Sequence, residues 1–282
     1  MASEPTVDEQ ISELARRYSQ RAAAYDSLWS PAIQPVGERL LERLPLAGAE
    51  HVIDVGTGAG ALLPAIRRAA HRAIILGIDR SEGMLKLARQ RHDGPLAVMD
   101  AQRLDLPDGR FDVALVAFVL FHLPNPDQCL QEVVRVLKPG GTVGTATWSA
   151  EHFAAANMIW DEELSAVGAA TFQLPATDNR ACCNSEAKMT RLLERAGFTE
   201  IRTWTESLEH RWRPEDHFEY QVRSTSRLRL ESLDLGDRDE CLRRVRARLA
   251  TASKEQYVFR GEVVMATAAR PDVSIEGLSR LE

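Results

Sequence analysis

One stretch, Val52–Gly60 with the sequence VIDVGTGAG, constrains the fold of this chain more than any other. An apolar, β-branched run ends in an acidic residue, and a loop with three glycines follows it. A helical pattern rich in alanine and leucine then begins at Ala61, so the predicted order is strand, tight turn and helix. Glycine permits a sharp turn with positive φ and lets a ligand lie against bare main chain. The free N–H groups at the start of the helix then face that ligand.

The glycine loop alone does not identify its ligand. Gly56, Gly58 and Ala61 also satisfy the G-x-G-x-x-G/A pattern of dinucleotide-binding proteins. These residues therefore leave a nicotinamide or flavin cofactor and S-adenosylmethionine (SAM) as equal alternatives, beside a purely structural role for the glycines. The rest of the chain has to decide between them.

Strands and helices alternate after this loop through the first half of the chain. Nearly continuous apolar runs predict further buried strands, at 73–79, 96–100, 111–120 and 142–148. Ser81 is a good N-cap for one intervening helix, and Asn125 or Asp127 for the next. This alternation is typical of an α/β fold with a doubly wound, mostly parallel sheet, whose ligand lies at the carboxyl ends of the strands.

The regular alternation stops after Trp148. The pattern then predicts helices at 153–167 and 185–196, one or two strands at 199–212, arginine-rich helical segments at 213–254 and a last strand at 258–268. We therefore expect an N-terminal helical lid (1–45), a ligand-binding core (46–150), a cap insertion (151–184), a core helix and strand (185–212), a helical cap insertion (213–254) and a last core strand with a tail (255–282).

Composition limits the class of partner and the cellular compartment in which the protein acts. The net charge of −6 argues against nucleic acid as the main partner, because nucleic-acid binders usually carry a basic surplus. No apolar run is long enough to span a bilayer, and Met1–Glu13 contains no signal-peptide core. The four cysteines lack C-x-x-C spacing, which indicates a reducing, cytoplasmic setting. The oligomeric state stays open, with a homodimer among the alternatives.

Three acidic residues each end a predicted strand: Asp54 the first, Asp79 the second and Asp100 the third. Side chains at such ends point into the crevice of a doubly wound fold. Asp79 also has the spacing from the glycines expected of an acid that accepts both ribose hydroxyls, since a carboxylate offers acceptors to a vicinal diol. One such aspartate is easily a solvated turn residue, but three at successive strand ends indicate a ligand site.

At this point the chain resembles the class I SAM-dependent methyltransferases, and most of all the small-molecule group typified by the quinone-biosynthesis methyltransferases. The resemblance covers about residues 15–150 and is carried by Asp54–Gly60 (DVGTGAG), Asp79, Met99-Asp100-Ala101, Phe111–Leu123 (FDVALVAFVLFHL) and Leu137–Gly141 (LKPGG). It implies a seven-stranded Rossmann-like methyltransferase fold in which the last strand, here Val258–Ala268, is inserted antiparallel beside the fifth.

The resemblance also implies which positions bind SAM. The glycine loop would lie against the methionine part, Asp79 would bind the ribose hydroxyls, and Asp100 would accept from the adenine amine. Tyr18 and Tyr25 lie where relatives place an aromatic over the methionine carboxylate. Two roles for these rings are therefore equally supported: a lid that closes over the ligand, or packing of the N-terminal helix onto the core. The implied cofactor set is Tyr18, Tyr25, Asp54, Gly56, Thr57, Gly58, Gly60, Asp79, Arg80, Met84, Asp100, Ala101, Gln102, Ala117, Phe118 and His122.

Methyl transfer needs no nucleophilic side chain, because its main requirement is an acceptor held in line about 3 Å from the activated methyl carbon. A base helps only when the acceptor is a phenol, hydroxyl or carbon acid. His122 follows the fourth strand at the edge of the crevice and is the best candidate base, with a structural role as its alternative. Weaker candidates from the cap are His152, His217 and Tyr257. No cluster has metal-ligand spacing, so we expect no metal.

The acceptor is narrowed by what the segment after the fourth strand contains. Ala117–His122 lacks the polar-Pro-Pro-aromatic motif with which related enzymes hold a nucleobase amine, which disfavours DNA or RNA as the acceptor. An apolar lining favours a small aromatic or otherwise apolar acceptor, and its candidates are Phe118, Phe121, Trp148 and Trp160. The cap arginines Arg223, Arg227 and Arg229 either bind an anionic substituent or form a solvated helix face.

Three other functions remain open from the residues. A SAM-binding protein with a sensing, scaffold or non-methylating role needs no catalytic residue. Arsenite methylation would need thiolates from Cys182, Cys183 and Cys241, although their spacing gives it no support. A dinucleotide oxidoreductase is disfavoured by Asp100 together with the LKPGG turn.

Overall fold

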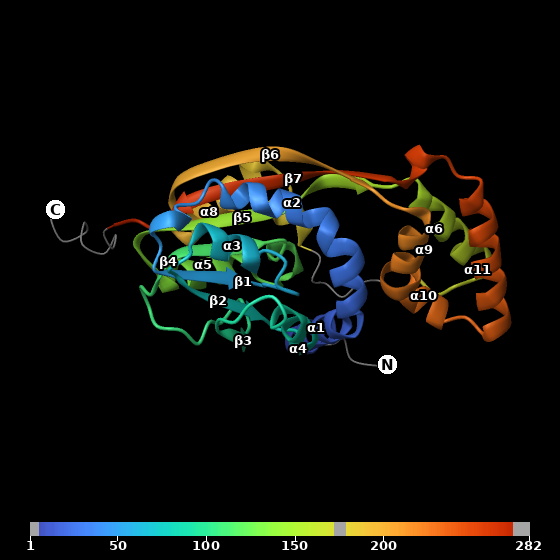
Figure 1. Cartoon of the computed structure of the whole chain (residues 1–282), viewed down its shortest axis with the longest axis horizontal. Helices are drawn as coiled ribbons and strands as arrows, with labels where there is room; N and C mark the ends of the chain where they lie inside the picture. The colour runs from blue at the N-terminus through green and yellow to red at the C-terminus, as the bar shows by residue number, and fades with distance from the viewer. Residues whose placement is uncertain (1–5, 172–178, 273–282) are drawn as a thin grey trace.

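A seven-stranded sheet forms the centre of the computed structural model, which describes residues 6–171 and 179–272 (Figure 1). The strand order is β3-β2-β1-β4-β5-β7-β6. The strands span His51–Val55 (β1), Ile74–Asp79 (β2), Leu96–Val98 (β3), Phe111–Ala117 (β4), Leu137–Phe153 (β5), Thr199–Arg211 (β6) and Val258–Ala269 (β7). Strands β1 to β5 pair in parallel, and β7 lies antiparallel between β5 and β6. The predicted fold and the place of the last strand are confirmed.

Helices lie against both faces of this sheet and beyond its end. They span Val7–Ala24 (α1), Ser30–Leu41 (α2), Leu63–Ala69 (α3), Glu82–Ala88 (α4), Pro126–Val136 (α5), Ala156–Ala166 (α6), Arg180–Cys183 (α7), Glu186–Ala196 (α8), Pro214–Tyr220 (α9), Arg227–Glu231 (α10) and Leu235–Ala250 (α11). Shorter helical turns are Tyr25–Trp29 (η1), Leu46–Gly48 (η2), Leu120–His122 (η3), Gln221–Thr225 (η4) and Lys254–Tyr257 (η5). Two caps behave as predicted, since the side chains of Ser81 and Asn125 accept from the N–H groups of Met84 and Gln128.

Two strands differ in length from the prediction. Strand β4 ends at Ala117 rather than residue 120, because the backbone of Phe118 turns to a φ of 59°. Strand β5 begins at Leu137, inside the predicted turn, and continues to Phe153. The extension to Phe153 follows from pairing with β7, which runs from Thr142 opposite Ala269 to Phe153 opposite Arg260. Tertiary pairing of this kind is invisible to a local pattern.

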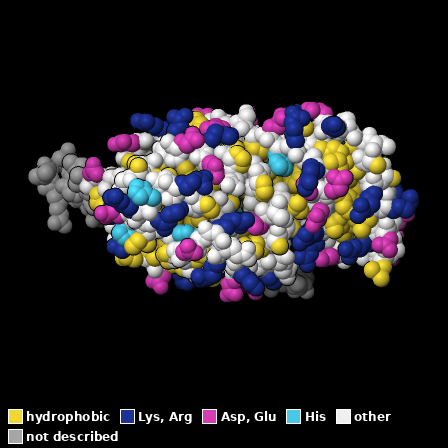
Figure 2. Space-filling view, in the orientation of Figure 1, with side chains coloured by type: hydrophobic (Ala, Val, Ile, Leu, Met, Phe, Trp, Pro, Cys, Tyr) yellow, Lys and Arg dark blue, Asp and Glu magenta, His cyan; other side chains and the backbone are white. Residues whose placement is uncertain are grey.

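The long ends of β6 and β7 leave the sheet and lead into a separate group of helices, α6, α9, α10 and α11 (Figure 1). We call these four helices the cap. Inside the cap, Glu163 is almost fully buried and pairs with Arg244 at 2.7 Å and Arg248 at 2.8 Å. The surface shown in Figure 2 mixes basic and acidic side chains without a large patch of either sign. No helix in the described part of the chain has the length and apolar character needed to cross a membrane.

The N-terminal region forms one nearly continuous helical run. Helix α1 passes through the π-helical turn η1 directly into α2. A π turn inserts an extra residue into a helix and often marks a functional site. Here it separates Tyr25 from Trp29, so the helix turns one aromatic toward the sheet end and the other toward the cap.

Candidate active site

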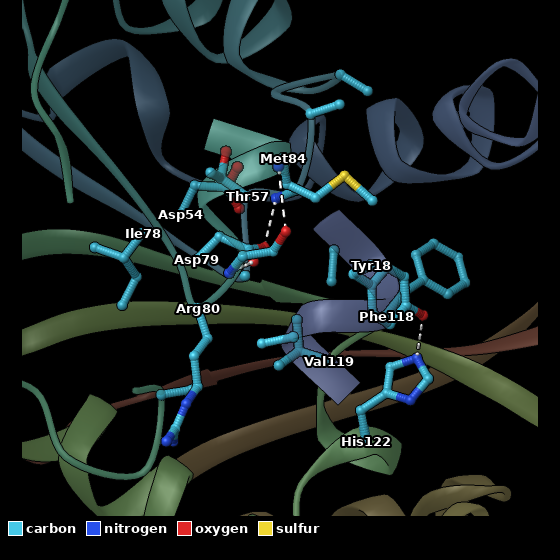
Figure 3. Close-up of a pocket in the computed structure, with 18 of the residues that line it drawn as sticks. Tyr18, Asp54, Thr57, Ile78, Asp79, Arg80, Met84, Phe118, Val119 and His122 are labelled. Atoms are coloured by element: carbon cyan, nitrogen blue, oxygen red, sulfur yellow. Dashed lines mark hydrogen bonds between the residues drawn. The ribbon is translucent and has the colours of Figure 1, made fainter. Parts of the chain in front are cut away.

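A pocket opens where β1, β2 and β4 end and where α1 lies across them. The sheet order reverses between β1 and β4, which is the usual ligand position in a doubly wound fold. Fourteen of the sixteen predicted cofactor residues line this pocket: Tyr18, Tyr25, Asp54, Gly56, Thr57, Gly58, Asp79, Arg80, Met84, Asp100, Ala101, Ala117, Phe118 and His122. The structure therefore brings together residues from five separate stretches of the chain: 18–25, 54–58, 79–84, 100–101 and 117–122. Figure 3 shows how several of them lie around the pocket.

Gly60 and Gln102 lie outside this lining. The N–H of Gly60 donates to the carbonyl of Thr57 at 2.9 Å, and a Cβ at Gly60 would approach Ala88 within 3.0 Å, so this glycine packs the loop against α4. The Gln102 side chain turns away and accepts from the Asn125 N–H at 2.8 Å. Both residues therefore stabilise the loops that form the pocket and do not line it.

The other two glycines serve the loop in different ways. Gly56 has a φ of 73°, and a Cβ there would lie 2.2 Å from Cγ2 of Val119. Gly58 has a φ of 56°, but nothing lies within 4 Å of the place of its Cβ. Gly56 is thus required by both backbone conformation and close contact, whereas Gly58 leaves open space beside the main chain.

Asp79 lies at the end of β2 with both carboxylate oxygens directed into the loop (Figure 3). Oδ2 accepts from the Gly58 N–H at 2.9 Å, and Oδ1 accepts from the Ser81 N–H at 2.8 Å. Burial raises the pKa of this carboxyl group above its usual value, and the backbone donors oppose that rise. Because each oxygen has two acceptor positions, Asp79 can still bind two neighbouring hydroxyl groups of a ligand.

The other two acids have contrasting surroundings. Asp54 is almost fully buried, and burial raises its pKa to about 6. Asp100 lies nearer the surface, where Oδ2 accepts from Arg80 at 2.6 Å and Oδ1 accepts from the Gln102 N–H at 2.9 Å. The pocket therefore holds three carboxylates, and of these only Asp100 has a cationic partner among the described residues.

The buried Asp54 predicts a stabilising substitution. Its folded-state pKa of about 6 lies above the value of 3.8 for an exposed aspartate, so ionising it costs folding free energy as pH rises through that interval. We expect Asp54→Asn to increase the free energy of unfolding at pH 7.5 by up to about 3 kcal/mol, with the difference from the wild type vanishing near pH 4. Guanidinium unfolding of both proteins at several pH values measures this difference. A variant less stable at pH 7.5 would contradict it.

Helix α1 contributes a polar contact to the pocket. The Tyr18 hydroxyl lies 2.8 Å from Nε2 of His122, with the two rings edge to face (Figure 3). Tyr25 packs against Tyr18 with ring centroids 5.8 Å apart. Burial raises the pKa of both phenols, and most for Tyr25. His122 belongs to the turn η3 directly after β4, so this contact joins the N-terminal helix to the end of the sheet.

Further contacts hold α1 and η1 against the core. Arg91 donates to both carboxylate oxygens of Asp26, at 2.7 and 2.9 Å, and to the Ala59 carbonyl in the glycine loop. Ser19 contacts the hydroxyl of the N-cap Ser81 at 2.8 Å. At Gly83 a Cβ would come within 2.7 Å of the Ser19 backbone, so glycine permits this close approach. The N-terminal helix is therefore attached to the elements that form the pocket.

The sequence predicted Phe118 in the site but did not reveal its backbone conformation. Its φ of 59° is costly for a bulky residue, and such strain gathers at functional sites. The Phe118 N–H still donates to Ala146 at 2.7 Å, while its ring lies 5.0 Å from that of Trp148. The ring of Trp148 in turn packs against that of Trp29, which stacks on Tyr220 with ring centroids 5.6 Å apart. An aromatic wall of these four residues thus leads from the pocket to the cap.

Several residues predicted near the acceptor lie elsewhere. Trp160 is buried against Phe218 in the cap, and Phe121 is buried outside the lining. Of the weaker base candidates, His217 is buried and bonded to Asn157, and Tyr257 donates to the Leu249 carbonyl. The side chain of His152 lies outside the described residues. The residue types suggested an apolar lining or a proton acceptor, but residue type does not determine which element a side chain faces.

The cap arginines and the cysteines are also placed by the structure. Arg223 pairs with Glu219, Arg227 with Glu231 and Arg229 with Asp161, so each arginine has a partner inside the cap. Among the described residues only Glu50, His51 and Asp112 form a group of three or more metal-binding side chains, so Cys182, Cys183 and Cys241 do not form a three-thiol site. Lys138 already pairs with Asp112 there at 2.6 Å.

Comparison with known proteins gives this architecture a family. A family model described as "Methyltransferase domain" matches residues 53–144. The chain is 33% identical over 141 residues to malonyl-[acyl-carrier protein] O-methyltransferase of Marinomonas sp. (strain MWYL1), covering 49% of this chain and 52% of the relative. It is 31% identical over 141 residues to phosphatidylethanolamine N-methyltransferase of Cereibacter sphaeroides, covering 48% and 67%. The matched segments thus span about half to two thirds of these relatives.

Solved structures share the fold over a larger part of the chain. The [4+2]-cyclase SpnF aligns with a TM-score of 0.57 at 20% identity, covering 96% of this chain and 98% of its own. Phosphoethanolamine N-methyltransferase 2 of Haemonchus contortus, in complex with phosphomonomethylethanolamine and S-adenosylhomocysteine, aligns with a TM-score of 0.53 at 17% identity, covering 95% and 60%. At this identity the likeness concerns the fold.

Proposed function

The chain belongs to the class I SAM-dependent methyltransferases, and we propose that it transfers the methyl group of SAM to an oxygen, nitrogen or carbon atom of a small, largely apolar or aromatic acceptor. The observation that carries this proposal is the composition of one pocket: the glycine loop, three carboxylates and the ring of Phe118 line it together, and Phe118 begins the aromatic wall that leads to the cap.

Charge distinguishes the two cofactors that the glycine loop allows. SAM carries a sulfonium and an ammonium group against one carboxylate, whereas a dinucleotide places a doubly charged pyrophosphate at the glycine loop. Asp54 lies buried at the base of this loop. A buried carboxylate there would repel pyrophosphate and attract a cation. This arrangement supports SAM over a nicotinamide or flavin cofactor.

We propose the binding roles that the family resemblance implies, and contacts in the pocket support them. The two free acceptor positions of Asp79 suit the vicinal hydroxyls of the ribose. Asp100, with Arg80 and Met84 nearby, suits the adenine, and the open backbone at Gly58 suits the methionine part. We propose that Tyr18 and Tyr25 cover the methionine end, so that residues 1–45 form a lid over the core and the remaining insertions form the cap.

SAM supplies an electrophilic methyl group on sulfur when it is bound. The protein then has to hold the acceptor in line with the breaking bond and exclude water. The lid and the aromatic wall serve both purposes, because they surround the space beside Phe118 and His122 with apolar rings. Phe118, Trp148, Trp29 and Tyr220 therefore favour a flat or apolar acceptor.

We propose His122 as the base for an acceptor that must lose a proton. A neutral imidazole accepts at one nitrogen only, and Tyr18 contacts Nε2. The acceptor hydroxyl would therefore replace the Tyr18 hydroxyl at Nε2, and the tyrosine would move aside as the lid admits the acceptor. Tyr18 thus keeps the base oriented between turnovers.

The pairing of Tyr18 and His122 predicts distinct kinetic effects for the two residues. We expect His122→Ala to lower kcat about 100-fold or more for a hydroxyl acceptor, while Tyr18→Phe keeps the ring and lowers kcat by less than about tenfold. Initial rates of methyl transfer measure both effects, and the affinity for S-adenosylhomocysteine verifies that the pocket is intact. An unchanged kcat in His122→Ala would remove this residue from the mechanism.

The proposed function is tested with SAM carrying a labelled methyl group and a whole-cell extract. Label that enters a small organic product supports the proposal, and label found only in nucleic acid or protein contradicts the acceptor class. Saturable binding of S-adenosylhomocysteine without any transfer would instead favour a sensing, scaffold or non-methylating role. Displacement of SAM by NADH would favour a dinucleotide enzyme.

The surroundings of the protein are part of the same proposal. Its four cysteines, Cys129, Cys182, Cys183 and Cys241, are all free thiols, which suits a reducing compartment. We therefore propose that it acts in the cytoplasm on a diffusible acceptor. Nucleic acid has no evident place in the site, since the charge of the chain is −6 and such partners prefer a basic surface.

A further inference from the structure

Two adjacent thiols converge on one oxygen atom beside the pocket. Cys182 and Cys183 end the short helix α7, and their Sγ atoms lie 2.8 and 3.8 Å from the carbonyl oxygen of Asn179. Thr147 on β5 contacts Sγ of Cys183 at 3.4 Å. Cys182 is partly exposed, whereas Cys183 is fully buried behind it. The pair therefore has one thiol that solvent reaches and a second thiol next to it.

The two thiols differ in acidity because they share a hydrogen bond. The Cys183 thiol donates toward Cys182 and lowers the pKa of Cys182 to about 7, while the same contact raises the pKa of Cys183. A thiolate is the form that reacts with soft electrophiles. The exposed member of the pair is thus the better nucleophile.

Geometry disfavours a direct disulfide between these neighbours. Consecutive Cα atoms are about 3.8 Å apart, whereas disulfides usually join Cα atoms about 4.4–6.8 Å apart. A larger bridging atom lets both thiols bind without closing that strained ring. Soft metal or metalloid atoms that prefer thiolate ligands can bridge the two thiols in this way.

Asn179 connects the thiol pair to the candidate active site. Its N–H donates to the Phe121 carbonyl at 2.9 Å, and its side-chain amide donates to the Leu123 carbonyl at 2.5 Å. These two carbonyls flank His122, which lines the pocket together with Leu123. A change at the Asn179 carbonyl is therefore transmitted to the segment that carries the candidate base.

We propose that Cys182 and Cys183 form a bidentate site for trivalent arsenicals and that its occupation weakens cofactor binding through Asn179. Each thiol gives up its proton, two sulfur–arsenic bonds form, and the arsenical oxygen leaves as water with both protons. No electron is transferred and no methyl group is involved. The site thus differs from the arsenite methylation considered above, which would require Cys241 as well.

Phenylarsine oxide is the probe for the site itself. Intact-mass measurement is expected to give one bridged phenylarsenic group per chain, removed by 2,3-dimercaptopropanol but not by an equal excess of a monothiol. Cys182→Ser and Cys183→Ser should each lose this adduct, while Cys129→Ser and Cys241→Ser should keep it. No adduct on the wild type, or a stable adduct on both single variants of the pair, would overturn the site. Thermal unfolding verifies that every variant is folded.

The coupling to the pocket is tested with S-adenosylhomocysteine, an arm that rests on the proposed function. Calorimetry is expected to show that loading the wild type with phenylarsine oxide weakens its binding of S-adenosylhomocysteine at least about fivefold. The same treatment should leave the affinity of Cys182→Ser unchanged. Equal affinity before and after loading would overturn the coupling. Absence of binding in the unloaded wild type would instead refute the proposed function, and the mass measurement would still decide the thiol site.

Discussion

Asp79→Ala is expected to lower the affinity for S-adenosylhomocysteine by at least about 100-fold. The carboxylate offers one acceptor position on each oxygen to a vicinal diol, while the N–H groups of Gly58 and Ser81 occupy the other positions. Hydrogen bonds to a charged group contribute about 1.5–3 kcal/mol each, so losing two of them exceeds the required 2.7 kcal/mol or so. The substitution also leaves two loop N–H groups without an acceptor. Isothermal calorimetry measures the effect.

Two controls separate this role from a loss of folding. Asp79→Asn keeps the size of the side chain but loses one acceptor and the charge, so its affinity should fall between that of the wild type and that of Asp79→Ala. Asp105→Ala removes an exposed aspartate and should bind S-adenosylhomocysteine as the wild type does. Binding by Asp79→Ala within about threefold of the wild type would refute the assignment of the ribose site.

Gly56→Ala is expected to cost both folding stability and cofactor binding. The added Cβ would lie 2.2 Å from Cγ2 of Val119, and the φ of 73° is unfavourable for alanine. The conformation costs about 1–2 kcal/mol and the overlap about 1–3 kcal/mol more. We therefore expect the free energy of unfolding to fall by about 2–5 kcal/mol, as denaturant unfolding measures. Binding should fall because Val119 also lines the pocket.

Gly58→Ala is the matched control, two residues further along the same loop. Its φ of 56° is also in the left-handed region, but no atom lies within 4 Å of the added Cβ. Its stability should therefore fall by only the conformational cost, about 1–2 kcal/mol. Equal destabilisation by the two substitutions would show that the contact with Val119 is not what requires glycine at position 56.

The local sequence pattern predicted the pocket well wherever a site residue follows a strand. Asp54, Asp79 and the glycines lie beside the pocket because parallel strands place their carboxyl ends at one edge. Gln102 is different, because its position next to Asp100 did not reveal that its side chain turns to the Asn125 N–H. Adjacency in sequence gives the neighbourhood of a side chain and leaves its direction undetermined.

Residues from distant segments were the hardest to predict. Tyr18, Tyr25 and Trp29 are spaced so that one regular helix would place them on roughly one face, but the π turn at Tyr25–Trp29 shifts the last of them toward the cap. Trp160 and His217 were expected near the acceptor and belong to the packing of the cap. The element that each of them faces depends on how the long strands β6 and β7 place the cap.

The sequence by itself determined the α/β class, the parallel core and the acidic residues at the strand ends, because these follow from local periodicity and from motifs within single strand–loop–helix units. The antiparallel last strand was implied by the family resemblance. Only the tertiary structure decided the contact of Tyr18 with His122, the strained backbone of Phe118 and the contact of Asn179 with the Phe121 carbonyl. Each of these depends on atoms far apart in the chain or on a backbone angle that no side-chain pattern encodes. Packing fixes such features, since a small shift of one element changes which atoms meet.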